Sequence, residues 1–175
     1  MLLRVALVLA VVLATADNLH AASAAATVNS IDANGVGAAL GTITFRDTKD
    51  GLVITPSLSG LPAGVHGFHI HEKGACGPAE HEGKPAAGFA AGGHYDPGHT
   101  AKHLGPYSSA GHKGDLPILV VDQEGKSTLP ILAPHLRVED VRGRSIMIHA
   151  GADNYSDQPT PLGGGGARLA CGVIK

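Results

Sequence analysis

The sequence lacks most of the features that nucleic-acid-binding proteins share. Its formal net charge is −2, from 13 basic and 15 acidic residues, only 3% of its residues are aromatic, and tryptophan is absent. Nucleic-acid recognition requires clustered lysine and arginine, with aromatic side chains where bases stack, and neither pattern occurs. We therefore expect no nucleic-acid partner. Because the whole molecule is slightly acidic, any attraction of an anion must come from local positive potential.

Long apolar runs are also scarce, and the single candidate lies at the N-terminus. Residues 1–4 supply a short basic start, residues 5–14 an apolar run, and residues 16–26 small side chains suited to signal-peptidase cleavage. This pattern is typical of a secretory signal peptide, and its apolar part is too short to span a bilayer. We expect residues 1–24 to be removed, with cleavage near Ala21 or Ala24. Residues 25–175 would then form one exported domain with no membrane contact.

Cysteine is rare, and Cys76 and Cys171 are the only two in the chain. They leave one possible intrachain pairing. In an exported protein a disulfide is favoured, because the compartments outside the cytoplasm are oxidising. A disulfide here would close a very long loop and contribute up to about 4–5 kcal/mol in the chain-entropy model. Two buried free thiols are the alternative if the protein is not exported.

Helical periodicity is missing as well. The chain instead has short segments in which apolar and polar residues alternate, separated by turns. No helix is long enough for a βαβ unit, while 25 glycines and 11 prolines indicate many turns. About eight short strands at regular spacing predict an all-β sandwich or barrel. One helical turn is expected at residues 138–141. The expected strands cover residues 27–33, 39–47, 52–58, the segment beginning at 64, 116–122, 126–132, 144–150 and 169–174, and two irregular loops cover residues 73–115 and 151–168.

Histidine is abundant, with 11 in the chain, and the segment at residues 64–76 carries two of them in a suggestive arrangement. Successive side chains of a strand point to opposite faces, so His69 and His71 share one face. Two imidazoles on one face of a stiff strand form a ready pair of metal ligands. His66 lies on the other face, with Ile70, and is expected to be a hydrogen-bonded core residue. His81, His99 and His135 match no ligand pattern and are expected to be exposed.

Two sets of candidate metal ligands emerge. The first loop contains three histidines and a carboxylate, which suit zinc because it accepts nitrogen and oxygen ligands in a tetrahedral set. A loop this long also requires something to order it. The strand pair and a histidine at the end of another strand suit copper, which favours nitrogen ligands. The zinc candidates are His94, His103, His112 and Asp115, and the copper candidates are His69, His71 and His149.

Four sequence motifs carry a family resemblance. They read Gly-Phe-His-Ile-His-Glu, Gly-Gly-His-Tyr-Asp-Pro, Gly-His-Lys-Gly-Asp-Leu-Pro and Gly-Gly-Gly-Gly-Ala-Arg-Leu-Ala-Cys-Gly-Val-Ile-Lys. With them the chain resembles the copper/zinc superoxide dismutases, and among these the bacterial periplasmic branch, from about residue 27 to residue 175. The resemblance implies an eight-stranded antiparallel Greek-key barrel, an immunoglobulin-like sandwich with two long functional loops; the family is a known example of this architecture.

The resemblance also implies roles for particular residues. One copper ion per chain would be held by His69, His71, His94 and His149. One zinc ion would be held by His94, His103, His112 and Asp115, so that His94 is shared between the metals. Asp153 would accept hydrogen bonds from one ligand of each metal. Arg168 would dock an anion beside the copper, and Cys76–Cys171 would be the family disulfide.

The implied activity is dismutation of superoxide to oxygen and hydrogen peroxide, through alternating one-electron reduction and oxidation of the copper. His94 and Arg168 would be the catalytic residues, and the periplasm is favoured over the extracellular medium. Lys84 is a candidate for steering the anion, with an ordinary solvated lysine as the alternative. The sequence leaves a monomer and a homodimer equally open.

Two other functions compete with dismutation. A non-catalytic copper carrier on the same scaffold typically lacks zinc ligands, the shared histidine or the docking arginine, and none is missing here. A purely structural sandwich domain would leave the metal motifs unexplained.

Overall fold

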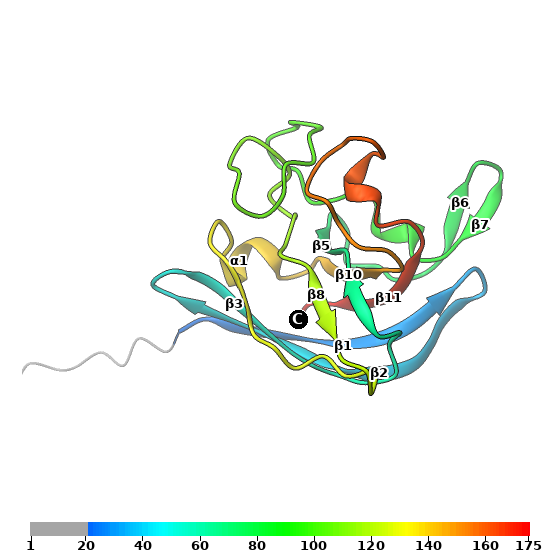
Figure 1. Ribbon diagram of the computed structural model, residues 1–175, viewed down its shortest axis with the longest axis horizontal. Helices are drawn as coiled ribbons and strands as arrows, with labels where there is room; N and C mark the ends of the chain where they lie inside the picture. The colour runs from blue at the N-terminus through cyan, green and yellow to red at the C-terminus, as the bar shows by residue number, and fades with distance from the viewer. Residues whose placement is uncertain (1–20) are drawn as a thin grey trace, which may run out of the picture.

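The computed structural model describes residues 21–175, and these residues form a curled antiparallel sheet with long loops on one side (Figure 1). Most of the predicted signal peptide, residues 1–24, lies outside the described residues, so its boundary stays a prediction. Within the described part of the chain, no helix is long and apolar enough to cross a membrane.

Seven strands form the main sheet, in the order β5–β10–β11–β1–β2–β3–β9. Their bounds are Ser23–Asp32 for β1, Gly35–Thr48 for β2, Gly51–Leu58 for β3, Phe68–His71 for β5, Ile131–Ala133 for β9, Ser145–His149 for β10 and Arg168–Val173 for β11. Two further antiparallel pairs are β4 (Gly64–His66) with β8 (Leu119–Val121), and β6 (Ala79–His81) with β7 (Lys84–Ala86). The helical turns are η1 (Phe89–Ala91), α1 (Val138–Val141) and η2 (Leu162–Gly164).

The predicted Greek-key barrel of eight strands is confirmed once two features are taken into account. Strands β4 and β5 are one strand interrupted at Gly67, and the β6–β7 hairpin lies outside the barrel. The turn at residues 122–126 links β8 to the segment that leads into β9. The connections from β3 to β4 and from β9 to β10 join strands that are not neighbours in the sheet, as a Greek key requires. The helical turn expected at residues 138–141 is α1.

One part of the expected layout is wrong. Residues 73–115 were predicted to lack strands and helices, yet they contain the β6–β7 hairpin and η1. The hairpin closes at Glu82 and Gly83, whose φ angles of 52° and 77° are both positive. A two-residue turn with two positive φ angles matches the twist of its strands. Glutamate rarely adopts such a conformation, so the sequence gives only a weak signal for this turn.

One face of β5 and β10 packs in the main core, and the opposite, outer face carries the candidate functional residues. Phe68 and Ile70 of β5, with Ile146 and Ile148 of β10, are fully buried in the main core. The alternate residues therefore lie on the outer face of the same strands. That outer face is covered in part by a smaller apolar cluster of Ile31, Ala91, Met147 and Cys171.

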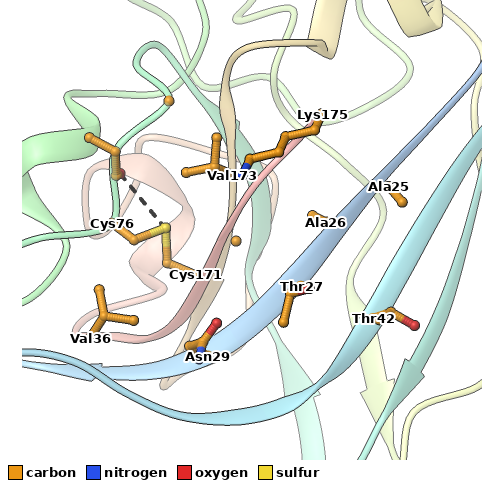
Figure 2. Close-up of a pocket in the computed structure, with 13 residues that line it drawn as sticks. Ala25, Ala26, Thr27, Asn29, Val36, Thr42, Cys76, Cys171, Val173 and Lys175 are labelled. Carbon is orange, nitrogen blue, oxygen red and sulfur yellow. Dashed lines mark hydrogen bonds between the residues drawn. A yellow bond between two sulfur atoms is a disulfide. The ribbon is translucent and has the colours of Figure 1, made fainter.

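The predicted disulfide is present. Cys76 and Cys171 are bonded, although they lie 95 positions apart in sequence, and the bond ties the first long loop to β11. Figure 2 shows it beside β1 and β11, next to a hollow whose lining includes Asn29 and Lys175. The loop is therefore anchored covalently at the edge of the smaller apolar cluster.

Candidate metal centre

The outer face of two barrel strands supplies the fixed part of the centre. His69 and His71 alternate with core residues on β5, and His149 is the last residue of β10, the strand beside β5. All three side chains are buried. Their positions are set by strands whose opposite face is packed in the main core, so the three imidazoles are held rigidly.

Residues from the first long loop join β5 by backbone pairing. His94 lies opposite His71, and Asp115 lies opposite His69, each as an isolated antiparallel bridge. The loop thus adds its candidate ligands to the edge of the sheet as short extra strands. This is how residues 21 positions apart in sequence, His94 and Asp115, come to share a contact of 2.9 Å between Nδ1 and Oδ1.

A glycine permits this close approach. Ile70 N donates to Gly114 O at 2.9 Å, and Tyr95 N donates to Ile70 O at 2.8 Å. A Cβ atom on Gly114 would lie 2.3 Å from Ile70 O and 2.8 Å from Tyr95 N. Any larger residue would push the loop away from β5, so Gly114 is required by the space and not by its own backbone angles.

The ligand atoms fall into two overlapping groups, each within 4.8 Å of one another. The first contains His69, His71, His94 and His149, and the second contains His69, His94, His103 and Asp115. The His94 ring stacks on His69 at 3.9 Å between centroids and lies 5.3 Å from His103. His94 and His69 are thus the two residues common to both groups.

Six buried atoms in this region have no hydrogen-bond partner, and all belong to predicted ligands. They are Nδ1 of His69, His103 and His112, Nε2 of His71 and His149, and Oδ2 of Asp115. Within residues 21–175, the only other such atom is Ser127 Oγ. Burying unpaired polar atoms is unfavourable by roughly 1–3 kcal/mol each, unless a group such as a metal ion satisfies them. The donor set of imidazole nitrogens and one carboxylate therefore fits copper and zinc.

One close pair of ligand atoms also indicates a cation site. His103 Nδ1 lies 3.0 Å from Asp115 Oδ2, although neither atom forms a hydrogen bond. The distance suits a hydrogen bond and the orientation does not. Two polar atoms this close, without a well-oriented hydrogen bond between them, are typical of two ligands of one cation.

In four of these five rings the opposite nitrogen is held by a partner. Asp153 accepts hydrogen bonds from His69 Nε2 at 2.7 Å and from His103 Nε2 at 2.8 Å, so one carboxylate orients a member of each group. His71 Nδ1 donates to Gly92 O at 2.9 Å, and His149 Nδ1 to Gly166 O at 3.2 Å. Such partners fix the tautomer, leaving the inner nitrogen as a lone pair.

Electrostatics favour neutral imidazoles in the first group. Burial lowers the pKa of His69 and His71 well below the usual value, and that of His149 to about 4. Burial alone would also lower the pKa of His103, but Asp115 and Asp153 raise it to about 9. A metal ion at His103 therefore competes with a proton, whereas one at the other three rings does not.

Comparison with known proteins decides the family. A sequence model described as copper/zinc superoxide dismutase (SODC) matches residues 39–174. The chain belongs to the copper/zinc superoxide dismutase family.

Three similar proteins within this family illustrate the match. A Cu-Zn superoxide dismutase of Escherichia coli (strain K12) is 50% identical over 169 residues, which cover 96% of each chain. The structure of a Cu/Zn superoxide dismutase from Brucella abortus is 46% identical, with a TM-score of 0.85, and covers 88% of this chain and 100% of that one. A solution structure of the monomeric copper, zinc superoxide dismutase from Salmonella enterica is 52% identical, with a TM-score of 0.78 and the same coverage.

In this superoxide dismutase, Arg168 lines a cleft together with His94 and His149. Its guanidinium donates to Gly88 O at 2.8 Å and to Gly92 O at 2.9 Å. Burial lowers its pKa to about 10, so it stays cationic at neutral pH. Within the described chain, Arg168 is the only arginine or lysine that lines the cleft, and Lys84 does not line it.

The structure gathers the predicted superoxide dismutase ligands, with one difference in the second group. His112 lies slightly outside the tightest set, its Nδ1 3.3 Å from Asp115 Oδ1. His69 takes its place there, with its ring centroid 5.5 Å from that of His103. His66 is buried as expected, with ring nitrogens 2.7 Å from His149 O and 2.9 Å from Pro62 O. The metal that each ligand holds stays a prediction.

Sequence reasoning missed residues that hold Asp153 in place. Tyr155 N donates to Asp153 Oδ1 at 2.7 Å, while Tyr155 Oη accepts from Ile118 N at 2.9 Å. Gly163 passes over the same carboxylate, where a Cβ atom would lie 2.0 Å from Asp153 Oδ1. The run of glycines at residues 163–166 was the available signal, since it indicates backbone that approaches another group closely.

Proposed function

We propose that this chain converts two superoxide anions and two protons into one molecule of oxygen and one of hydrogen peroxide. Membership of the family supports the reaction. The observation that carries the proposal is the set of six buried, unpartnered ligand atoms arranged around the shared His94. The clustering of these unpartnered nitrogen and oxygen atoms supports a cation site there independently of the fold.

The residues divide between two metals in this proposal, with one ion of each per chain. Copper would be held by His69, His71, His94 and His149, and zinc by His94, His103, His112 and Asp115. When bound, copper supplies a reversible one-electron couple, and zinc supplies positive charge without redox chemistry.

Arg168 would bind the substrate. Two of the five N–H groups of its guanidinium are used by the Gly88 and Gly92 carbonyl groups, so the others are available to a small anion. A permanently charged, planar donor docks an anion without titrating near neutral pH. Because Gly92 O also accepts from His71 Nδ1, the docking group and a candidate copper ligand are fixed to the same carbonyl.

His94 would carry the proton. Its Nδ1 faces Asp115 Oδ1 at 2.9 Å, which assigns that nitrogen to the zinc group and leaves Nε2 for the copper group. Nε2 would hold a proton and pass it to the forming hydrogen peroxide, while the second proton comes from water in the cleft. Asp153 and Asp115 would hold the neighbouring rings in a fixed orientation, because both carboxylates are buried and each contacts more than one histidine.

Metal analysis of the mature protein, together with direct measurement of superoxide consumption, tests this function. We expect about one copper and one zinc per chain, and activity that is lost without copper. His94→Ala should lower activity and abolish the magnetic and optical signature of two coupled metals. His135→Ala is the matched control, because His135 is exposed and lies outside both ligand groups.

Two outcomes would contradict the proposal. Full wild-type activity in copper-free protein would reject the mechanism. Tight copper binding without superoxide consumption would favour the copper-carrier alternative.

Export to the bacterial periplasm is part of the same proposal. The basic, apolar N-terminus supports export, and the Cys76–Cys171 disulfide is consistent with an oxidising compartment. The enzyme would protect against superoxide outside the cytoplasm. A monomer is supported by the likeness to the monomeric Salmonella enterica protein, and gel filtration of the mature chain tests it against a homodimer.

A further inference from the structure

The turn η1 surrounds the guanidinium of Arg168 with three contacts from five consecutive residues. Gly88 O and Gly92 O, at its two ends, each accept one of the guanidinium N–H groups. Between them, the Phe89 ring lies under the guanidinium, with Cζ 4.1 Å from the ring centroid. A short piece of chain therefore contacts both the edge and the face of one side chain.

The backbone of this turn is shaped for the contact. Gly88 has a φ angle of 68°, and a Cβ atom there would lie 2.7 Å from Ile31 Cδ1 and 3.3 Å from Arg168 Cδ. Glycine is therefore needed both for the left-handed conformation and for the close approach to the arginine stem. The approach brings Phe89 into the wall of the cleft that His94, His149 and Arg168 also line.

The β6–β7 hairpin extends the arrangement outward. His81, at the end of β6, stacks on the Phe89 ring at 4.2 Å between centroids with 27° between the planes. The hairpin projects from the barrel on the side that carries the long loops (Figure 1). An element that otherwise packs little against the barrel thus contacts the aromatic ring that supports the arginine.

We propose that Phe89 is a positioning residue that holds the Arg168 guanidinium in place for anion docking, and that His81 supports the ring. This inference rests on the proposed function only in taking Arg168 as the docking group. A cation over an aromatic face is attracted by the ring quadrupole, and the attraction is stronger when the cation is partly buried away from water. The two backbone hydrogen bonds fix the edge of the guanidinium, and the ring restricts its tilt, so that the remaining N–H groups stay directed for an anion.

Nuclear magnetic resonance of the reduced, diamagnetic copper–zinc protein tests the contact without using activity. In the wild type, the Nε–H resonance of Arg168 should be shifted upfield by the Phe89 ring current, and Arg168→Lys identifies that resonance by its loss. Phe89→Leu should abolish the upfield shift, and Phe89→Tyr, which keeps the aromatic face, should retain it. Leu162→Ala is the matched control, because Leu162 lines the same cleft and offers no ring.

Titration with inorganic phosphate, followed at the same resonance, tests the consequence. Phe89→Leu should weaken phosphate binding about fivefold, within the range expected for loss of one cation–π contact. Phe89→Tyr should bind as the wild type does, and His81→Ala should weaken binding by about twofold, since it removes only support for the ring.

The inference is overturned if Phe89→Leu keeps both the ring-current shift and wild-type phosphate affinity. It is also overturned if Phe89→Tyr loses the shift and the affinity to the extent expected for Phe89→Leu. A loss in Leu162→Ala equal to that in Phe89→Leu would also overturn it, because any apolar truncation would then suffice. Failure of the proposed function would appear separately, as a loaded wild-type protein that does not consume superoxide although its Arg168 resonance responds to Phe89.

Discussion

A single carboxylate, Asp153, sets the direction of two imidazole rings that belong to different ligand groups. Its two oxygens accept from His69 Nε2 and His103 Nε2, and all three side chains are fully buried. Because the outer nitrogen of each ring donates to Asp153, the inner nitrogen is the one that faces a cation. The orientation of these two rings therefore depends on one residue that does not line the cleft.

Asp153→Asn should weaken binding of both metals by about 10- to 100-fold, the range found for such supporting partners. The amide oxygen accepts from one histidine, but the amide NH₂ group then meets the N–H of the other. Competition with a chelator, measured separately for copper and zinc, checks this. Asp50→Asn, in an exposed turn, should change the dissociation constant of neither metal. Equal metal affinities in the two variants would contradict the role of Asp153.

Arg168→Ala should lower kcat/KM for superoxide about tenfold or more, since a hydrogen-bonded charge contributes roughly 1.5–3 kcal/mol. Metal content should be unchanged, because Arg168 contacts backbone carbonyl groups and not a ligand nitrogen. Stopped-flow decay of superoxide measures the effect. Arg46→Ala, which removes the same charge from an exposed strand position, serves as the control, and identical rates in both variants would remove Arg168 from the site.

Much of the site could be predicted from individual residues, and there is a physical reason why the rest could not. The ligands were found because a histidine pair on a strand and a cluster in a loop have few other uses. Phe89 and Tyr155 were missed because aromatic residues are ordinarily core or surface residues, and their role arises only when distant segments meet. Gly163 lies in a run of four glycines, but the carboxylate that it covers could not be read from its neighbours.

At the scale of elements, the centre is assembled by adding loop backbone to the edge of a barrel strand. The β-bridges from His71 to His94 and from His69 to Asp115 achieve this, and Gly114 makes room for it. The barrel strands themselves were largely predictable, because alternation and turn residues are local signals. The β6–β7 hairpin was not, since its turn at Glu82 depends on a backbone angle that the residue type disfavours.

Gly114→Ala should destabilise the protein by about 2 kcal/mol or more, because the added Cβ collides with two backbone atoms that cannot move independently. Zinc affinity should fall with it, since His94 and Asp115 are displaced together. Gly93→Ala is the matched control, because nothing lies within 4 Å of a Cβ there. Chemical denaturation of both variants measures the difference, and similar midpoints would show that the loop docks without the glycine.

The start of β1 constrains where the signal peptide is removed. β1 begins at Ser23, Ala24 is buried, and Arg142 donates to Ser23 O at 2.6 Å. Cleavage after Ala21 keeps these contacts, whereas cleavage after Ala24 removes the first two residues of the strand. We expect the mature chain to begin at Ala22, and mass spectrometry of the exported protein checks this. A mature chain that begins at Ala25 would contradict it.

At the scale of the whole molecule, folding and metal binding are coupled, because the six unpartnered ligand atoms are created by folding. They come from the first long loop and from two barrel strands, so that an ion bound there links the loop to the barrel. Metals that bind only the folded state stabilise it by mass action. The disulfide acts on the same loop from its other end.

Removal of both metals should lower the melting temperature by about 10 °C or more. One ion at a free concentration 1,000 times its Kd adds about 4 kcal/mol, and for a domain of this size each kcal/mol shifts Tm by roughly 2–4 °C. Scanning calorimetry of loaded and chelated protein, with the disulfide intact in both, measures the shift. Coincident transitions would mean that the ligand cluster forms no stabilising cation site.

The spread of the ligands along the sequence, from His69 to His149, has a consequence for how the protein matures. The first group does not exist until β5 and β10 lie side by side, and the second requires residues from His69 to Asp115 to be folded together. If the chain crosses a membrane unfolded, as the proposed export requires, the ions are acquired at the destination, after translocation is complete. The supply of copper and zinc in that compartment, rather than in the compartment of synthesis, then limits how much working enzyme a cell obtains.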